Sequence, residues 1–124
     1  FGLLRNDYVP IIAPLGNSLK GKTYNVNADL FASTLAYLVK AERLFLFTDV
    51  GGVKKGKKII AKLNKKQANF LIKKNVIASG MIPKVTSAIT AIDKGVKEVF
   101  ILKSSRNVLK NILVNKKVYG TRIV

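Results

Sequence analysis

Residues 44–47, Leu-Phe-Leu-Phe, form an apolar run without any polar side chain. A strand with one face in water alternates apolar and polar residues, so this run is typical of a strand covered on both faces, as in a parallel sheet. Before it, Asn27 can cap a helix with Asp29 in its first turn and apolar side chains at helical spacing as far as Val39. The sequence therefore predicts a helix that leads into a buried strand.

The second half of the chain repeats this rhythm. Asn64 can begin one helix, and Pro83 occupies a first-turn position in the next. Further elements are predicted as a strand at 98–102, a helix at 108–113, a terminal strand at 121–124, and loops at 16–23 and 53–58. The apolar run 9–15 has the length of a buried strand. Together these patterns predict a single α/β domain with an open, mainly parallel sheet flanked by helices.

Composition excludes several classes of protein. The chain has 124 residues, 48% of them hydrophobic, which is enough to bury a core. It contains no Cys and no His, which excludes disulfides, zinc knuckles, Ser-His-Asp triads and His-ligated metals within these residues. No apolar run approaches the ~18 residues of a membrane span. The first residue is Phe1 rather than Met, and we therefore expect the chain to be the carboxyl portion of a longer protein.

The charge balance suggests an alternative function. Lys+Arg 23 against Asp+Glu 6 gives a formal net charge of +17. Nine lysines lie between Lys54 and Lys74, and such a segment binds phosphate backbones non-specifically. The same window holds one aromatic residue, Phe70, and no Arg, so it is poorly suited to stacking and base readout. A basic nucleic-acid-binding module is thus the alternative. The abundance of Lys, Asn and Ile is also compatible with an AT-rich plastid or low-GC bacterial genome.

Three polar segments are candidates for a site. Residues 24–29, Tyr-Asn-Val-Asn-Ala-Asp, place amides and a carboxylate where a strand turns into a helix, although on spacing alone an ordinary helix cap is the favoured explanation. Residues 48–53, Thr-Asp-Val-Gly-Gly-Val, follow the buried strand, and a plain turn would also use their glycines. Residues 79–84 end with Lys84 at a helix start, where it can either meet phosphate or lie solvated at the surface.

These segments, in this order and spacing, resemble the carboxyl-terminal half of the acetylglutamate kinases, within the amino acid kinase family. The resemblance runs from about Tyr8 to Ile123. It is carried by six stretches, namely 11–16 (IIAPLG), 24–29 (YNVNAD), 40–44 (KAERL), 48–53 (TDVGGV), 80–85 (GMIPKV) and 120–123 (GTRI). It implies the nucleotide-binding half of an amino acid kinase fold. The implied reaction is transfer of the γ-phosphoryl group of ATP to the γ-carboxylate of N-acetyl-L-glutamate, in arginine biosynthesis.

The resemblance also implies roles for individual residues. Asn25 falls on the substrate-binding asparagine, Asp29 on the aspartate that organises the catalytic lysines, and Lys84 on the lysine that stabilises the transition state. The nucleotide-contacting positions are Asp49, Val50, Gly51, Gly52, Val53, Val76, Ile77, Ala78 and Gly80. ATP and Mg²⁺ are the implied cofactors, and no residue is assigned as a metal ligand. Phosphoryl transfer needs positioning and charge neutralisation more than covalent chemistry, so the lack of His and Cys is compatible with it.

Family features outside these residues shape the remaining expectations. The family's glycine-rich loop, second catalytic lysine and main dimer contacts belong to its amino half. We therefore expect residues 1–124 to be the carboxyl-terminal nucleotide-binding portion, inactive alone and part of a homo-oligomer, with the PII nitrogen-signalling protein as a candidate partner. A catalytically inactive nucleotide-binding domain is a further alternative. Arginine-inhibited relatives carry an acidic stretch where this chain reads 114–119, Val-Asn-Lys-Lys-Val-Tyr, so arginine sensitivity stays open. The expected location is a plastid or the bacterial cytoplasm, without membrane association.

Overall fold

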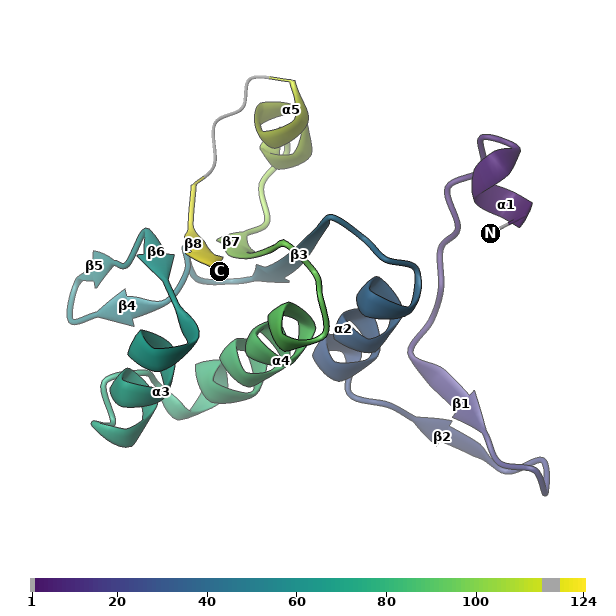
Figure 1. Ribbon diagram of the computed structural model, residues 1–124, viewed down its shortest axis with the longest axis horizontal. Coiled ribbons are helices and arrows are strands. Elements are labelled where there is room, and N and C mark those ends of the chain that lie inside the picture. The colour runs from purple at the N-terminus through teal and green to yellow at the C-terminus, as the bar shows by residue number, and fades with distance from the viewer. Residues whose placement is uncertain (1, 115–118) are drawn as a thin grey trace.

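A four-stranded sheet lies at the centre of the computed structural model, which describes residues 2–114 and 119–124 (Figure 1). Its strand order is β3 (Arg43–Thr48), β7 (Glu98–Lys103), β8 (Thr121–Ile123) and β6 (Lys62–Leu63). β3 pairs with β7 and β6 with β8 in parallel, while β8 runs antiparallel to β7. The predicted α/β class with a mainly parallel sheet is confirmed, with one antiparallel contact in the middle.

Helices cover both faces of this sheet. On one face lie α2 (Ala28–Leu38), α3 (Lys65–Lys73) and α4 (Ile82–Asp93), whose buried side chains form one apolar cluster with the sheet. On the other face α5 (Val108–Leu113) packs on Phe100 and Leu102 (Figure 1). The predicted cap at Asn64 is present, since Asn64 and Gln67 form a reciprocal capping box at the start of α3.

The helices α2 and α4 pack side by side (Figure 1). The side chains buried in α2 are Ser33 and Ala36, and those in α4 include Ala88 and Ala91. Small side chains let two helices approach closely, and this fixes where their amino-terminal ends lie. Because each helix leads into a parallel strand and runs back against it, both ends lie toward the edge where β3 and β7 finish.

The prediction of a buried strand at 9–15 is wrong. After the short helix α1 (Gly2–Arg5), Val9 is 87% and Ile11 98% exposed, and no strand includes residues 9–14. Only Leu15 joins a strand, because β1 (Leu15–Asn17) pairs with β2 (Thr23–Asn25) as an antiparallel hairpin. Figure 1 shows this arm extending away from the sheet. An apolar run needs a neighbouring strand to pair with, and in the described chain the β1–β2 pairing begins only at Leu15.

Two further expectations need correction. β3 is an edge strand of the described sheet, so its run 44–47 is not fully covered: Leu46 is buried but Phe47 is 39% exposed. The predicted loop at 53–58 contains a hairpin of β4 (Lys54–Lys55) and β5 (Lys58–Ile59), with Gly56 in the left-handed region at its turn. A 3₁₀ turn, η1 (Ser79–Met81), precedes α4. Of the stretch 114–119, residues 115–118 lie outside the described residues.

Candidate functional site

The side chains of Lys84 and Asp29 form an ion pair between the amino-terminal ends of two helices. Lys84 Nζ donates to Asp29 Oδ1 at 2.6 Å, across 55 residues of sequence. Their side chains are 17% and 21% exposed, so the pair is partly shielded from water but still open on one side. The structure thus brings together the two residues that the resemblance implies as catalytic.

Local sequence explains why both side chains lie at helix starts. Asn27 caps α2 by accepting a hydrogen bond from Leu30 N at 3.0 Å, which puts Asp29 in the first turn. Pro83 lies in the first turn of α4, and no side chain caps this helix. The partial positive charge of a helix start favours Asp29 and also attracts an incoming anion beside Lys84. An anion at this point would meet the ammonium group of Lys84 and the amino-terminal end of α4.

Asn25 lies at the approach to the same helix end. It is the last residue of β2, two positions before the cap Asn27, and its side chain is exposed. Asn25 pairs with Leu15 across the hairpin, and the neighbouring Val26 N donates to Pro14 O at 2.9 Å. The hairpin therefore fixes the backbone at Asn25 and leaves its side-chain amide without a hydrogen bond in the described chain, so that the amide is open to a ligand.

The segment 48–53 begins at the end of β3 and is ordered by its own side chains. Thr48 Oγ1 donates to Asp49 Oδ1 at 3.0 Å and accepts from Val50 N at 3.5 Å. Asp49 is exposed, whereas Val50 and Gly51 are half-buried. The exposed carboxylate and the following backbone lie at the carboxyl edge of the parallel strands, where ligands bind in sheets of this kind.

The end of this segment is anchored in the core rather than open to solvent. Val53 is 0% exposed, its N–H donates to Thr121 Oγ1 at 2.8 Å, and its carbonyl accepts from Ile60 N at 2.9 Å. Gly52 has φ +146 and lies so close that an added Cβ would be 2.8 Å from Thr121 Oγ1. Sequence reasoning missed Thr121, because its role depends on a contact that only the tertiary structure reveals.

The second segment implied for the nucleotide, 76–80, connects α3 to α4. Ile77 is buried in the core, Val76 is half-buried, and Ala78 and Gly80 are exposed. Ala78 O accepts from Met81 N at 2.8 Å, which closes the 3₁₀ turn just before Lys84. The exposed part of this segment therefore leads directly to the start of α4.

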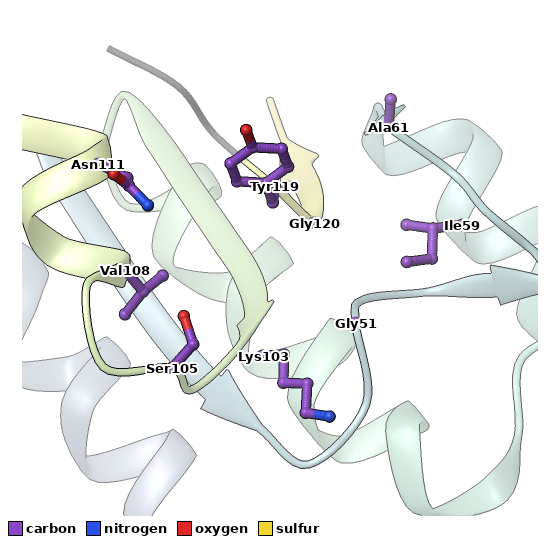
Figure 2. A pocket seen from close by; sticks show the side chains of 9 residues that line it. All are labelled: Gly51, Ile59, Ala61, Lys103, Ser105, Val108, Asn111, Tyr119 and Gly120. Atoms are coloured by element: carbon purple, nitrogen blue, oxygen red, sulfur yellow. The ribbon is translucent and has the colours of Figure 1, made fainter. Parts of the chain in front are cut away.

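A cavity of about 550 Å³ lies beside the 48–53 segment, on the side of α5 (Figure 2). Gly51 lines it together with Lys103 and Ser105, which follow β7, and with Tyr119 from the approach to β8. Its lining includes none of the described residues Asn25, Asp29 and Lys84. The cavity thus meets the candidate site only through the backbone at Gly51.

Comparison with known proteins assigns the chain to a family. The model of the amino acid kinase family matches residues 2–103, which includes Asn25, Asp29, Asp49 and Lys84. This chain belongs to the amino acid kinase family. None of the helices in the described residues has the length and apolar character that a membrane span requires.

Curated relatives point to one branch of the amino acid kinases. The chain is 52% identical over 104 residues to an acetylglutamate kinase of Aquifex aeolicus, covering 82% of this chain and 35% of that protein. It is 42% identical over 123 residues to an acetylglutamate kinase of Kosmotoga olearia, covering 98% of this chain and 44% of that protein. The chain therefore spans about two fifths of the length of these relatives.

Solved structures share its fold. Smu.665 from Streptococcus mutans is 33% identical with a TM-score of 0.84, over 99% of this chain and 45% of that protein. N-acetylglutamate synthase from Neisseria gonorrhoeae, complexed with coenzyme A and L-arginine, is 27% identical with a TM-score of 0.89. The match covers 99% of this chain and 29% of that protein. Carbamate kinase from Giardia lamblia, bound to AMP-PNP, is 26% identical with a TM-score of 0.68. The match covers 89% of this chain and 40% of that protein.

Proposed function

We propose that residues 1–124 are the carboxyl-terminal, nucleotide-binding portion of an acetylglutamate kinase. The complete enzyme would transfer the γ-phosphoryl group of ATP to the γ-carboxylate of N-acetyl-L-glutamate. The observation that carries this proposal is the Lys84–Asp29 pair at two helix starts, 2.6 Å long and partly shielded from water. The curated relatives, which are acetylglutamate kinases, support the choice of acceptor.

The chemistry asks for charge neutralisation at the place where Lys84 lies. A carboxylate oxygen attacks the γ-phosphorus, the bond to the β–γ bridging oxygen breaks, and that oxygen leaves as part of ADP. Negative charge shifts onto the bridging oxygen during this step. A lysine beside it stabilises the transition state more than the bound substrate. In this proposal Lys84 supplies the positive charge, and Asp29 holds its ammonium group in position.

Other described residues would bind the two substrates. Asn25 offers an amide that can hydrogen-bond to N-acetyl-L-glutamate. Asp49 and the backbone of Val50 and Gly51 would contact the nucleotide from one side, and Ala78 and Gly80 from the other. Among the described residues, no cluster of three or more His, Cys, Asp or Glu side chains could hold a metal ion. Mg²⁺ would enter with the phosphates of ATP, whose charge it partly neutralises.

Partners follow from the same proposal. As an acetylglutamate kinase, the complete protein would form a homo-oligomer and could be a target of the PII nitrogen-signalling protein. Bacterial relatives are consistent with a bacterial source, and a plastid source stays a prediction.

The test is a comparison of phosphoryl acceptors in the full-length protein. ADP release with Mg·ATP should depend on N-acetyl-L-glutamate and should be far slower with L-glutamate, L-aspartate or carbamate at equal concentration. Appearance of a hydroxylamine-reactive acyl phosphate identifies the γ-carboxylate as acceptor. ADP release that is equally fast with every acceptor, or with none, would refute the assignment.

A further inference from the structure

Thr121 contacts the proposed nucleotide segment, 48–53, although the two lie far apart in sequence. It begins β8, pairs with Ile101 of β7 and is 0% exposed. Its hydroxyl accepts the N–H of Val53 at 2.8 Å. This is a side-chain contact between the terminal strand and a segment that precedes it by 68 residues. No role in the proposed function requires this hydroxyl, so its position needs an explanation.

The backbone around Thr121 is shaped for this contact. Gly52 has φ +146, and a Cβ there would lie 2.8 Å from Thr121 Oγ1 and 3.0 Å from Thr121 N. On the other side, Gly120 has φ +133, and a Cβ would lie 2.5 Å from Ile101 O. Glycine alone tolerates both the backbone conformation and the close approach. Two glycines therefore allow the 48–53 segment and the terminal strand to meet at the threonine hydroxyl.

The contact controls where the exposed part of the segment lies. Thr48 fixes its start through Asp49 and Val50 N, and Thr121 fixes its end through Val53 N. Only Asp49, Val50 and Gly51 lie between these two anchors and at least partly in solvent. A buried N–H that loses its acceptor destabilises the conformation that buried it. Without the hydroxyl, Val53 would move toward water and carry Asp49 to Gly51 with it.

We propose that Thr121 is a positioning residue for the nucleotide: its buried hydroxyl holds the 48–53 segment in the conformation that presents Asp49, Val50 and Gly51 to ATP. This inference rests on the proposed function. It assigns Thr121 an effect on ATP binding and little effect on the chemical step, because Lys84 and Asp29 are held by other elements.

The test uses Thr121→Val in the full-length protein, since valine keeps the shape and removes the hydroxyl. The KM for ATP should rise by about ten-fold with kcat nearly unchanged, as expected for one lost acceptor at a buried N–H. Hydrogen exchange at the Val53 amide should become faster. Thr121→Ser keeps the hydroxyl and should restore both values. Ile123→Val, a buried change on the same strand, is the matched control and should alter neither.

Each other outcome has a defined meaning. Faster exchange at Val53 with an unchanged KM for ATP would overturn the positioning role, and so would a Thr121→Ser variant as impaired as Thr121→Val. If Thr121→Val does not fold, Thr121→Cys takes its place, because a thiol keeps the volume but accepts weakly. An intermediate KM then supports the proposal and a wild-type KM overturns it. A wild-type protein that binds no ATP would instead refute the proposed function.

Discussion

Lys84 Nζ lies 2.6 Å from Asp29 Oδ1 and joins the first turns of α2 and α4, although 55 residues separate them in sequence. Each residue taken alone has an ordinary explanation, since helix starts favour Asp and surfaces are rich in Lys. Their contact at two adjacent helix ends is the observation on which the proposed phosphate site rests. The geometry also separates the two roles, because only the lysine can carry positive charge to a phosphoryl group.

Replacing Lys84 by Arg should not restore full activity. A guanidinium keeps the charge but presents it as a planar fork on a longer side chain, in a space fitted to a compact ammonium. We expect Lys84→Arg to have a kcat at least about ten-fold below wild type, yet above that of Lys84→Ala. Steady-state kinetics of the full-length variants measure this. Equal kcat for Lys84→Arg and wild type would show that charge alone suffices.

Asp29 should act through Lys84 rather than on the substrate. Asp29→Asn keeps the size and removes the charge that orients the ammonium, so kcat should fall by about ten-fold or more. In a double-mutant cycle, adding Asp29→Asn to Lys84→Ala should cost little further activity, because the partner is already missing. Additive losses in kcat would mean that Asp29 contributes independently of Lys84.

Much of the framework around this pair was predictable from local sequence. Asn27, Pro83 and the apolar spacing of their helices are local signals, and the structure has α2 and α4 where these signals put them. The prediction of a buried strand at 9–15 was wrong for the opposite reason, because strand formation depends on a partner strand that local sequence does not reveal. Ile11 is exposed although its neighbours are nearly all apolar.

The candidate site was likewise predictable from local sequence only in part. Asn25, Asp29, Asp49 and Lys84 belong to recognisable segments, and their types are suited to phosphate and carboxylate chemistry. Thr121 could not be found this way, since a threonine in a terminal strand is unremarkable by type and spacing. Its contact with Val53 N spans 68 residues and exists only through the antiparallel placement of β8 against β7.

Gly120 should be among the least replaceable glycines of the chain. At φ +133, an added Cβ would lie 2.5 Å from Ile101 O and 2.8 Å from Leu102 Cβ. Gly120→Ala should therefore lower the free energy of unfolding by about 3 kcal/mol or more, since strain and overlap act together. Gly95→Ala is the matched control: φ is +104 but no heavy atom lies within 4 Å, so the loss should be about 1–2 kcal/mol.

Urea unfolding of both glycine variants, followed by circular dichroism, measures the difference. A Gly120→Ala variant as stable as Gly95→Ala would mean that β8 shifts to make room, and that its close approach to β7 is not required.

Binding to DNA should be electrostatic and without sequence preference. The stretch from Lys54 to Lys74 contains nine lysines and no Arg, so it can neutralise phosphates but lacks the planar fork that reads guanine. Affinity for generic duplex DNA should fall steeply as salt rises toward ~200 mM. Fluorescence anisotropy with labelled duplexes of different sequence checks this. A sequence-specific complex that survives this salt would favour the nucleic-acid-binding alternative.

The most direct measurement is the kcat for N-acetyl-L-glutamate-dependent ADP release by full-length wild type, Lys84→Ala and Lys73→Ala. Lys73 is an exposed lysine in the last turn of α3 and serves as the charge-matched control. The proposed role of Lys84 predicts that Lys84→Ala lowers kcat by on the order of 10²–10³ with a smaller change in the KM for ATP, while Lys73→Ala changes little. A near-normal kcat for Lys84→Ala would contradict it.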